Sequence, residues 1–364
     1  METWRRLVRL LYRTASDLFP GYFSLVMATG ALSISNQLLG YRAVAKILLA
    51  INVVAYVLLA GLILLRLFRF FPRVIRDITD HAVGPGFFTL VAGTCVFGSQ
   101  LIIVGDASAV AHWLWILGLG LWITIMYTFF FAVTVREHKP ALTSGINGAW
   151  LIAAVATQAV SVLGTLAAPT FGAMHEIVLF VALAMYLLGA MLYLAIITLI
   201  FYRFTFIKVT VESMTPPYWI NMGAVAISTL AGATLMLHAD EWSFIVGVLP
   251  FIKGFTLFFW VTATWWIPLL VLLMAWRHFW RRHPIRYEPQ FWGMVFPLAM
   301  YTTATFQLAK SEHLDFLLVI PEGFVFVALA AWILTFLGLL RAMARGLFAT
   351  TYSSPANQSA KTVS

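Results

Sequence analysis

Phe19-Pro20-Gly21-Tyr22-Phe23 opens a long apolar stretch, and its pattern returns four times along the chain. The later copies are Pro85-Gly86-Phe87-Phe88, Asn147-Gly148-Ala149-Trp150, Pro216-Pro217-Tyr218-Trp219 and Pro289-Gln290-Phe291-Trp292. Counted from Tyr22, Phe87, Ala149, Tyr218 and Phe291, the copies are 65, 62, 69 and 73 residues apart. Each interval has room for two membrane-crossing helices, so all five copies would point the same way and could close around an axis. Chance recurrence is the alternative, because proline favours helix starts and aromatic residues favour membrane interfaces.

The composition is that of a membrane protein. Hydrophobic residues make up 62% of the 364 positions, charged residues only 10%, and the mean hydropathy is +0.92. Soluble domains carry about 25% charged residues, so we expect an all-α integral membrane protein that lies in a lipid bilayer. Ten apolar stretches are long enough to span it, at residues 19–39, 43–68, 84–104, 108–135, 148–168, 174–202, 216–238, 244–276, 290–309 and 318–340.

The positions of the basic residues predict the orientation. If both termini are cytoplasmic, 19 of the 23 Lys and Arg residues lie on the inner side, as the positive-inside rule requires. Residues 1–18 would then be a basic cytoplasmic segment, 19–340 a single transmembrane domain and 341–364 a polar cytoplasmic tail, in the cytoplasmic membrane. The net charge of +9 reflects this asymmetry, so no nucleic-acid partner is expected.

The ten stretches alternate in chemistry. Odd-numbered stretches are rich in Ser, Thr, Asn, Gln and Gly, whereas residues 47–67 of the second are almost unbroken aliphatic sequence. Polar groups are costly against lipid, which favours five hairpins in a quasi-fivefold arrangement, with odd helices lining a central pore and even helices outside. Small and hydroxyl residues also mediate close helix packing without any pore, so that alternative stays open.

Aligning the five odd helices on their aromatic pairs predicts layers of pore-lining side chains. The layers contain Met27, Ala92, Ala154, Gly223 and Phe296; then Gly30, Cys95, Thr157, Ala226 and Ala299; then Ile34, Ser99, Ser161, Leu230 and Thr303. A single large Phe296 among small residues could plug the lumen as a hydrophobic gate, or it could be an ordinary packing residue. We expect helix kinks at Pro297, Pro20, Pro85, Pro216 and Pro289, because proline removes a backbone donor.

Three stretches carry a family resemblance: Phe19-Pro-Gly-Tyr-Phe-Ser-Leu-Val-Met-Ala-Thr-Gly30, the segment 253–268 and Phe291-Trp-Gly-Met-Val-Phe-Pro-Leu-Ala-Met300. They resemble the tellurite-resistance/dicarboxylate transporter family, which contains fungal malate permeases, bacterial tellurite-resistance membrane proteins and plant guard-cell slow anion channels. The resemblance implies five hairpins around a pore, a homotrimer, and a ninth-helix Phe that occludes each pore, which corresponds to Phe296. One departure is the fifth helix, which opens with Asn147 and Ala149.

The distribution of charge favours anions. Acidic residues fall in loops or at helix ends, whereas a cation pathway or proton relay needs an acid within the membrane. Five helix N-termini would converge on the cytoplasmic mouth. Lys253, about nine residues into the eighth span, could bind an anion, pair with Asp240 or Glu241, or extend to the membrane surface.

The sequence therefore predicts a Phe-gated channel or transporter for small anions, either C4-dicarboxylates such as malate or monovalent ions such as chloride and nitrate. Alternatives are a proton-coupled exporter of organic anions or oxyanions such as sulfite or tellurite products, and a membrane sensor or scaffold without flux. No catalytic set, nucleotide loop or metal-ligand spacing stands out, so we expect no enzyme activity, cofactor or metal.

Overall fold

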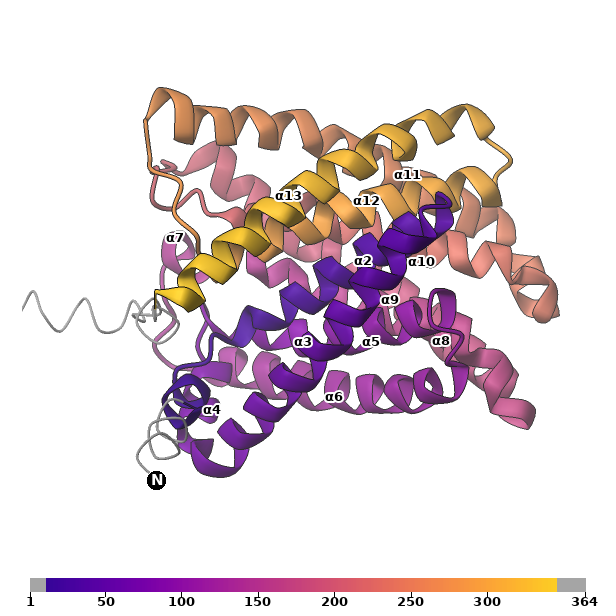
Figure 1. Cartoon of the computed structure of the whole chain (residues 1–364), viewed down its shortest axis with the longest axis horizontal. Coiled ribbons are helices and arrows are strands. Elements are labelled where there is room, and N and C mark those ends of the chain that lie inside the picture. Colours follow the sequence, from indigo (N-terminus) through magenta and orange to yellow (C-terminus); the bar gives the residue numbers. More distant parts are fainter. Residues whose placement is uncertain (1–10, 346–364) are drawn as a thin grey trace, which may run out of the picture.

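The computed structural model describes residues 11–345, and helices account for most of them (Figure 1). No β-strand occurs within that range, so the prediction of an all-α protein is confirmed. Both ends of the described chain lie at the same end of the helical bundle (Figure 1). Most of the predicted N-terminal segment and of the C-terminal tail lies outside the described residues.

Each copy of the repeated sequence pattern forms a short 3-10 turn that continues into an α-helix. The turns are η1 (Pro20–Phe23), η2 (Gly84–Phe87), η3 (Gly148–Leu151), η5 (Pro216–Trp219) and η8 (Pro289–Phe291). The helices that follow are α2 (Ser24–Leu38), α5 (Phe88–Ile103), α8 (Ile152–Ala167), α10 (Ile220–Leu237) and α12 (Trp292–Ser311). We call these five the inner helices.

The prolines of the pattern begin helices and do not kink them, which corrects that expectation for Pro20, Pro85, Pro216 and Pro289. Each occupies one of the first two positions of its 3-10 turn, where its missing N–H has no partner to lose. The third copy has no proline. There the Asn147 side chain accepts a hydrogen bond from the Ala149 backbone N–H at 2.8 Å, which caps the turn in another way. Of the five predicted kink positions, only Pro297 lies inside a helix, α12.

A long outer helix follows each inner helix. These are α3 (Arg42–Arg69), α6 (Ser108–Val135), α9 (His175–Phe206), α11 (Ser243–Ala275) and α13 (Val319–Ala344). Short helices α4 (Phe71–Ile78) and α7 (Leu142–Gly145) lie in the connections at the end where both termini are found (Figure 1).

By length and composition, seven helical segments of the described chain could cross a membrane. One of them, Gly148–Phe206, joins α8 and α9 through Gly172, whose φ is +53°. The segments differ sharply in burial. In the most apolar stretch of Pro216–Leu237, 94% of residues are buried, against 17% in Arg42–Arg69. The outer helices therefore present apolar side chains to the surroundings, as lipid contact requires.

The inner helices contact one another in a closed circuit. α2 packs against α5, α5 against α8, α8 against α10, α10 against α12, and α12 returns to α2. Each outer helix packs on the inner helix of its own hairpin. In Figure 1 the yellow α13 and the indigo α2 lie side by side, which brings the last hairpin against the first.

Hydroxyl groups of the inner helices bond to aromatic side chains of outer helices from the preceding hairpin. The Trp332 indole N–H donates to the Thr29 hydroxyl at 2.9 Å, that of Trp122 to Thr157 at 2.8 Å and that of Trp260 to Thr305 at 3.0 Å; the Tyr56 and Thr94 hydroxyls are 3.2 Å apart. These bonds join neighbouring hairpins. Much of the polarity of the inner helices thus serves helix packing, the alternative that the sequence left open.

In α10, Gly232 occupies a position of this kind between neighbouring hairpins, where other inner helices carry a hydroxyl residue. This yields a testable prediction. A Cβ at Gly232 would lie 1.9 Å from the Thr256 hydroxyl, which is itself 3.0 Å from that of Tyr186. We expect Gly232→Ala to force α10 and α11 apart and to lower the thermal unfolding temperature in detergent, at an overpacking cost of about 1–3 kcal/mol. Gly254→Ala in α11, where nothing lies within 4 Å, is the control. Equal unfolding temperatures for the two variants would contradict this account.

Candidate functional site

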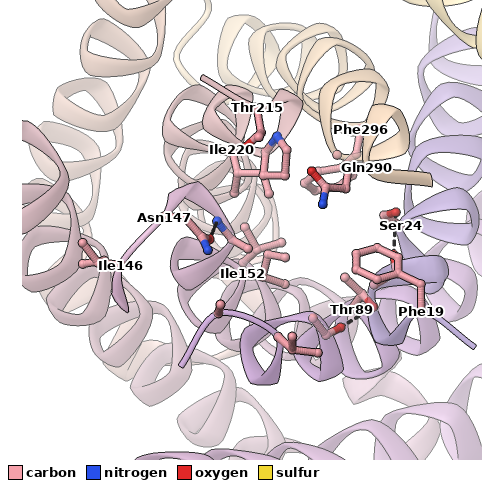
Figure 2. A pocket seen from close by; sticks show the side chains of 18 of the residues that line it. Phe19, Ser24, Thr89, Ile146, Asn147, Ile152, Thr215, Ile220, Gln290 and Phe296 are labelled. Atoms are coloured by element: carbon pink, nitrogen blue, oxygen red, sulfur yellow. Dashed lines mark hydrogen bonds between the residues drawn. The ribbon is translucent and has the colours of Figure 1, made fainter. Parts of the chain in front are cut away.

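The entrances of the inner helices surround a cavity of about 260 Å³. The labelled side chains in Figure 2 come from several of these entrances and surround one hollow. Its lining comprises Phe19, Gly21, Ser24, Met27, Ala82, Val83, Gly86, Thr89, Thr143, Ser144, Ile146, Asn147, Ala149, Ile152, Val155, Arg203, Ser213, Thr215, Pro217, Ile220, Gln290, Gly293 and Phe296. We call it the entrance cavity.

The lining of the entrance cavity is neutral except for one arginine. Arg203 is the single charged residue in it, and no Asp or Glu of the described chain contributes. Four of its hydroxyls are used locally: Ser24 donates to the Gly21 carbonyl and Thr89 to the Gly86 carbonyl, both at 2.7 Å. Ser144 and Ser213 likewise donate to backbone carbonyls three residues earlier. These bonds stabilise the turns at the cavity mouth, as hydroxyls at helix starts commonly do.

Phe296 and Met27 lie at the deep end of the entrance cavity. The lining residues of the last hairpin are Gln290 in η8 and Gly293 and Phe296 in α12, so Phe296 is the one farthest from the start of the turn. Its side chain is buried, at 1% exposure. On the neighbouring α10, a Cβ at Gly223 would lie 2.6 Å from Pro297 Cγ; the glycine therefore lets α10 and α12 approach closely beside the aromatic ring.

A second, much smaller cavity of about 20 Å³ lies further along the same five helices. Its lining begins one turn beyond Phe296 and Met27, at Met300 and Ala31. Apolar side chains dominate it, with Thr234, Gln307, Ser99 and Thr303 as the polar members; the other residues are Ile34, Val96, Ile103, Ala159, Val162, Leu166, Ile227 and Leu230.

The structure places the first predicted layer as follows. Met27 and Phe296 line the entrance cavity, whereas Ala92, Ala154 and Gly223 are not among its lining residues. The choice of Ala154 was wrong by one position, because Val155 lines the cavity in its place. The third copy corresponds to the others through Trp150, not Ala149. Gly148 then takes the place of Pro20, and each begins its 3-10 turn.

The members of the second predicted layer line neither of the two cavities. The position of Gly30 faces Val96 and the Asn52 amide, and Cys95 lies against Gly118 of α6. Thr157 bonds to Trp122, and Ala226 and Ala299 are buried without lining either cavity. An α-helix turns in 3.6 residues, so the residue that follows Met27 along the axis is Ala31, four positions on, and not Gly30.

Four of the five residues of the third predicted layer line a cavity. Ser99 and Thr303, with Ile34 and Leu230, line the smaller cavity. Ser161 was wrong, because it donates to the Ala182 carbonyl of α9 at 2.7 Å and so faces an outer helix. The error arose, as for Ala154, because the third copy was aligned one residue out of register. The residue of α8 that lines the smaller cavity is Val162.

Lys253 pairs with a different acid from those expected. Its ammonium lies 3.3 Å from a Glu312 carboxylate oxygen, with 43% of the lysine side chain exposed. Glu241 instead lies 3.3 Å from His175, so the expected pair with Asp240 or Glu241 was wrong. Lys253 lines neither of the two cavities described above.

Sequence reasoning missed a set of buried arginines at the ends of outer helices. Arg66 Nη1 donates to the Leu18 carbonyl at 2.9 Å, and Arg203 and Arg277 donate in the same way to Ile146 and Met214. In each case the acceptor lies two residues before the 3-10 turn of the same hairpin. The positive-inside rule had explained these arginines as topology signals. These arginines occur at one per hairpin, as the aromatic pattern does, and this recurrence could have indicated a structural role.

Arg136 occupies the corresponding place in the second hairpin and shapes the charge near the mouth. Its Nη1 donates to the Thr79 carbonyl at 3.3 Å. Burial, together with the nearby Arg136, lowers the pKa of His81, so this imidazole is neutral at pH 7 and adds no charge. Among the described residues, no cluster of His, Cys, Asp and Glu could hold a metal ion.

Comparisons with known proteins agree with this membrane architecture. An uncharacterized transporter of Methanocaldococcus jannaschii is 24% identical over 327 residues, covering 88% of this chain and 91% of its own length. The sulfite efflux pump SSU1 of Arthroderma benhamiae is 24% identical over 347 residues, covering 88% and 89%. A membrane protein of Mycobacterium tuberculosis is 39% identical over 153 residues, covering 42% and 77%.

The family is established by a match over almost the whole helical domain. The model of the SLAC1 family, described as voltage-dependent anion channels, matches residues 17–340, which agrees with the resemblance seen in the aromatic motifs. The protein is therefore a member of the SLAC1 family of anion channels and transporters.

Proposed function

We propose that small anions pass through the ring of inner helices and that Phe296 closes the route. The observation that carries this proposal is the placement of Phe296. It is buried at the deep end of the entrance cavity, and Met300 of the same helix lines the second cavity one turn further on. An aromatic ring between two cavities on one axis has the position of a plug.

In this proposal ten helices cross the membrane as five hairpins around a quasi-fivefold axis. The closed circuit of contacts among the inner helices and the exposure of the outer helices support it. Both described ends of the chain lie on one side of the bundle (Figure 1), as an even number of spans requires. The arginine-rich outer-helix ends assign that side to the cytoplasm. The cytoplasmic membrane and the trimer remain expectations from the sequence and the family resemblance.

Selectivity for anions follows from what surrounds the entrance cavity. A cation would find no described carboxylate in its lining. Five helices begin at the same mouth, and each N-terminus carries a partial positive charge that favours an anion. With Arg203 as the only charged lining residue, the potential there is positive.

The closed state is maintained by an apolar constriction. Because Thr157 and Ser161 bond to outer helices, they cannot replace the hydration shell of an ion as the sequence had suggested. Beyond Phe296 the route narrows to mostly aliphatic side chains such as Ala31, Val96 and Ile227. A hydrated anion is excluded from so narrow an apolar passage by the cost of losing its water. Movement of Phe296 would be the opening step.

Replacing the proposed plug should open the route. We expect Phe296→Ala to raise anion conductance about tenfold or more over wild type in planar bilayers, because the apolar constriction widens and admits water. Phe88→Ala is the matched control: Phe88 is equally buried on an inner helix but lines neither cavity. Wild-type currents in a folded, reconstituted Phe296→Ala variant, or an equal rise in the control, would reject the plug.

A second candidate function is proton-coupled export of an oxyanion such as sulfite, which the name of the fungal relative supports. The absence of a described carboxylate in the cavity lining favours a passive route instead. The substrate class, whether dicarboxylate, oxyanion or halide, is part of the proposal.

A pH gradient separates the two mechanisms. In proteoliposomes with the membrane voltage clamped by valinomycin and potassium, we expect a gradient of one pH unit to drive no uphill accumulation of radiolabelled sulfite or chloride. Accumulation that an uncoupler abolishes would establish proton coupling and displace the channel mechanism. Absence of any anion flux, under either gradient and in the Phe296→Ala variant, would favour a sensor or scaffold.

A further inference from the structure

Arg203 differs from the other buried arginines in what surrounds its charge. It lies in the last turn of α9, 9% exposed, and one of its nitrogens donates to the Ile146 carbonyl. Arg66 and Arg277 make the same kind of bond and are similarly buried. These three side chains therefore share one structural task, which is to hold the start of an inner helix.

Acidic side chains act on the charges of both Arg66 and Arg277. Arg66 Nη2 lies 2.5 Å from an Asp77 carboxylate oxygen. Arg277 forms no ion pair with a described acid; burial has the larger effect on its pKa and lowers it, whereas the negative charges of Glu288 and Glu212 raise it. Arg203 forms an ion pair with no acidic side chain of the described chain, and its other charge-related contact is the Tyr218 ring, whose centroid is 5.9 Å from the guanidinium carbon. A buried cation without a counter-charge is unfavourable.

Arg203 also lines the entrance cavity, which the other two arginines do not. The cavity carries neutral polar groups from the same side of the ring, among them Ser144, Asn147, Ser213 and Thr215. At about 260 Å³ it can hold a small anion with some of its water, since one water molecule takes up about 30 Å³ in the liquid.

We propose that Arg203 binds the permeating anion in the entrance cavity and that this site favours oxyanions and carboxylates over halides. The inference rests on the proposed function and names the substrate class of the same route. A guanidinium offers N–H groups in a planar fork that two oxygens of one anion can accept together, whereas a spherical halide cannot match this geometry. The bound anion supplies the missing counter-charge, and the Thr215 hydroxyl and the Asn147 side-chain NH2 at the cavity can donate to it further.

Equilibrium binding to the purified full chain in detergent tests the site directly. The probes are sodium sulfite, sodium acetate and sodium chloride, measured by calorimetry for wild type, Arg203→Lys and Arg277→Lys. Arg203→Lys keeps the positive charge but loses the fork. We expect it to weaken sulfite and acetate binding about tenfold, while chloride binding changes less than about threefold. Arg277→Lys, which alters the matching bond outside the cavity, should leave the sulfite-to-chloride ratio at the wild-type value.

Several outcomes would overturn the site. These are unchanged sulfite and acetate binding in a folded Arg203→Lys, an equal loss for chloride, an equal loss in Arg277→Lys, or no anion binding to wild type at all. Thermal unfolding of each variant confirms that it is folded, and Arg203→Gln provides a second substitution with the charge removed. A failure of the proposed Arg203 site can be told apart from a failure of the proposed transport route. Phe296→Ala currents test the route without reference to Arg203, and binding in detergent tests the site without reference to flux.

Discussion

Hydrogen bonds between outer-helix aromatic side chains and inner-helix hydroxyls are the interaction on which this architecture depends. Inside a bilayer there is no water to hydrogen-bond with a polar side chain, so each such side chain needs a partner within the protein. Trp332 reaches Thr29, Trp122 reaches Thr157 and Trp260 reaches Thr305, and each bond runs from one hairpin to the next. The same bonds join the hairpins into a ring and direct hydroxyl groups away from its axis.

Beyond the entrance cavity, the space between the inner helices is therefore lined mainly by apolar and small side chains. Polarity is concentrated at the mouth, where turns, hydroxyls and Arg203 meet. Deeper along the inner helices, Phe296 and Met27 are followed by Ala31 and Met300. An ion would thus be received at a polar, positive mouth and resisted by an apolar constriction, a division suited to a route that is closed at rest.

Arginines carry two roles at once in this protein. Their position at the ends of the outer helices is the basis, through the positive-inside rule, for the proposed orientation. Three of them also donate to the backbone carbonyls that precede the inner helices, so they hold the loops of the mouth in place. A charge count reveals only the first role. The second needs the hairpin to fold back, because Arg203 and Ile146 are 57 residues apart in sequence.

The sequence by itself determined the class and the repeat. Apolar length determined where the long helices lie, and the aromatic pattern placed the start of each inner helix within a residue or two of its 3-10 turn. The same pattern drew attention to Phe296, which the structure buries at a cavity. These features are local or periodic, so they follow from the order of residues alone.

Only the tertiary structure decided which face of each inner helix turns toward the axis. The third copy was placed one residue out of register because Gly148, and not Asn147, takes the place of proline at the start of its turn, and that shift exchanged Val155 for Ala154. The choice between Gly30 and Ala31 needed the helical rotation relative to neighbours, and the partner of Lys253 needed the spatial position of Glu312. Such choices depend on contacts between distant segments, which residue type and spacing do not encode.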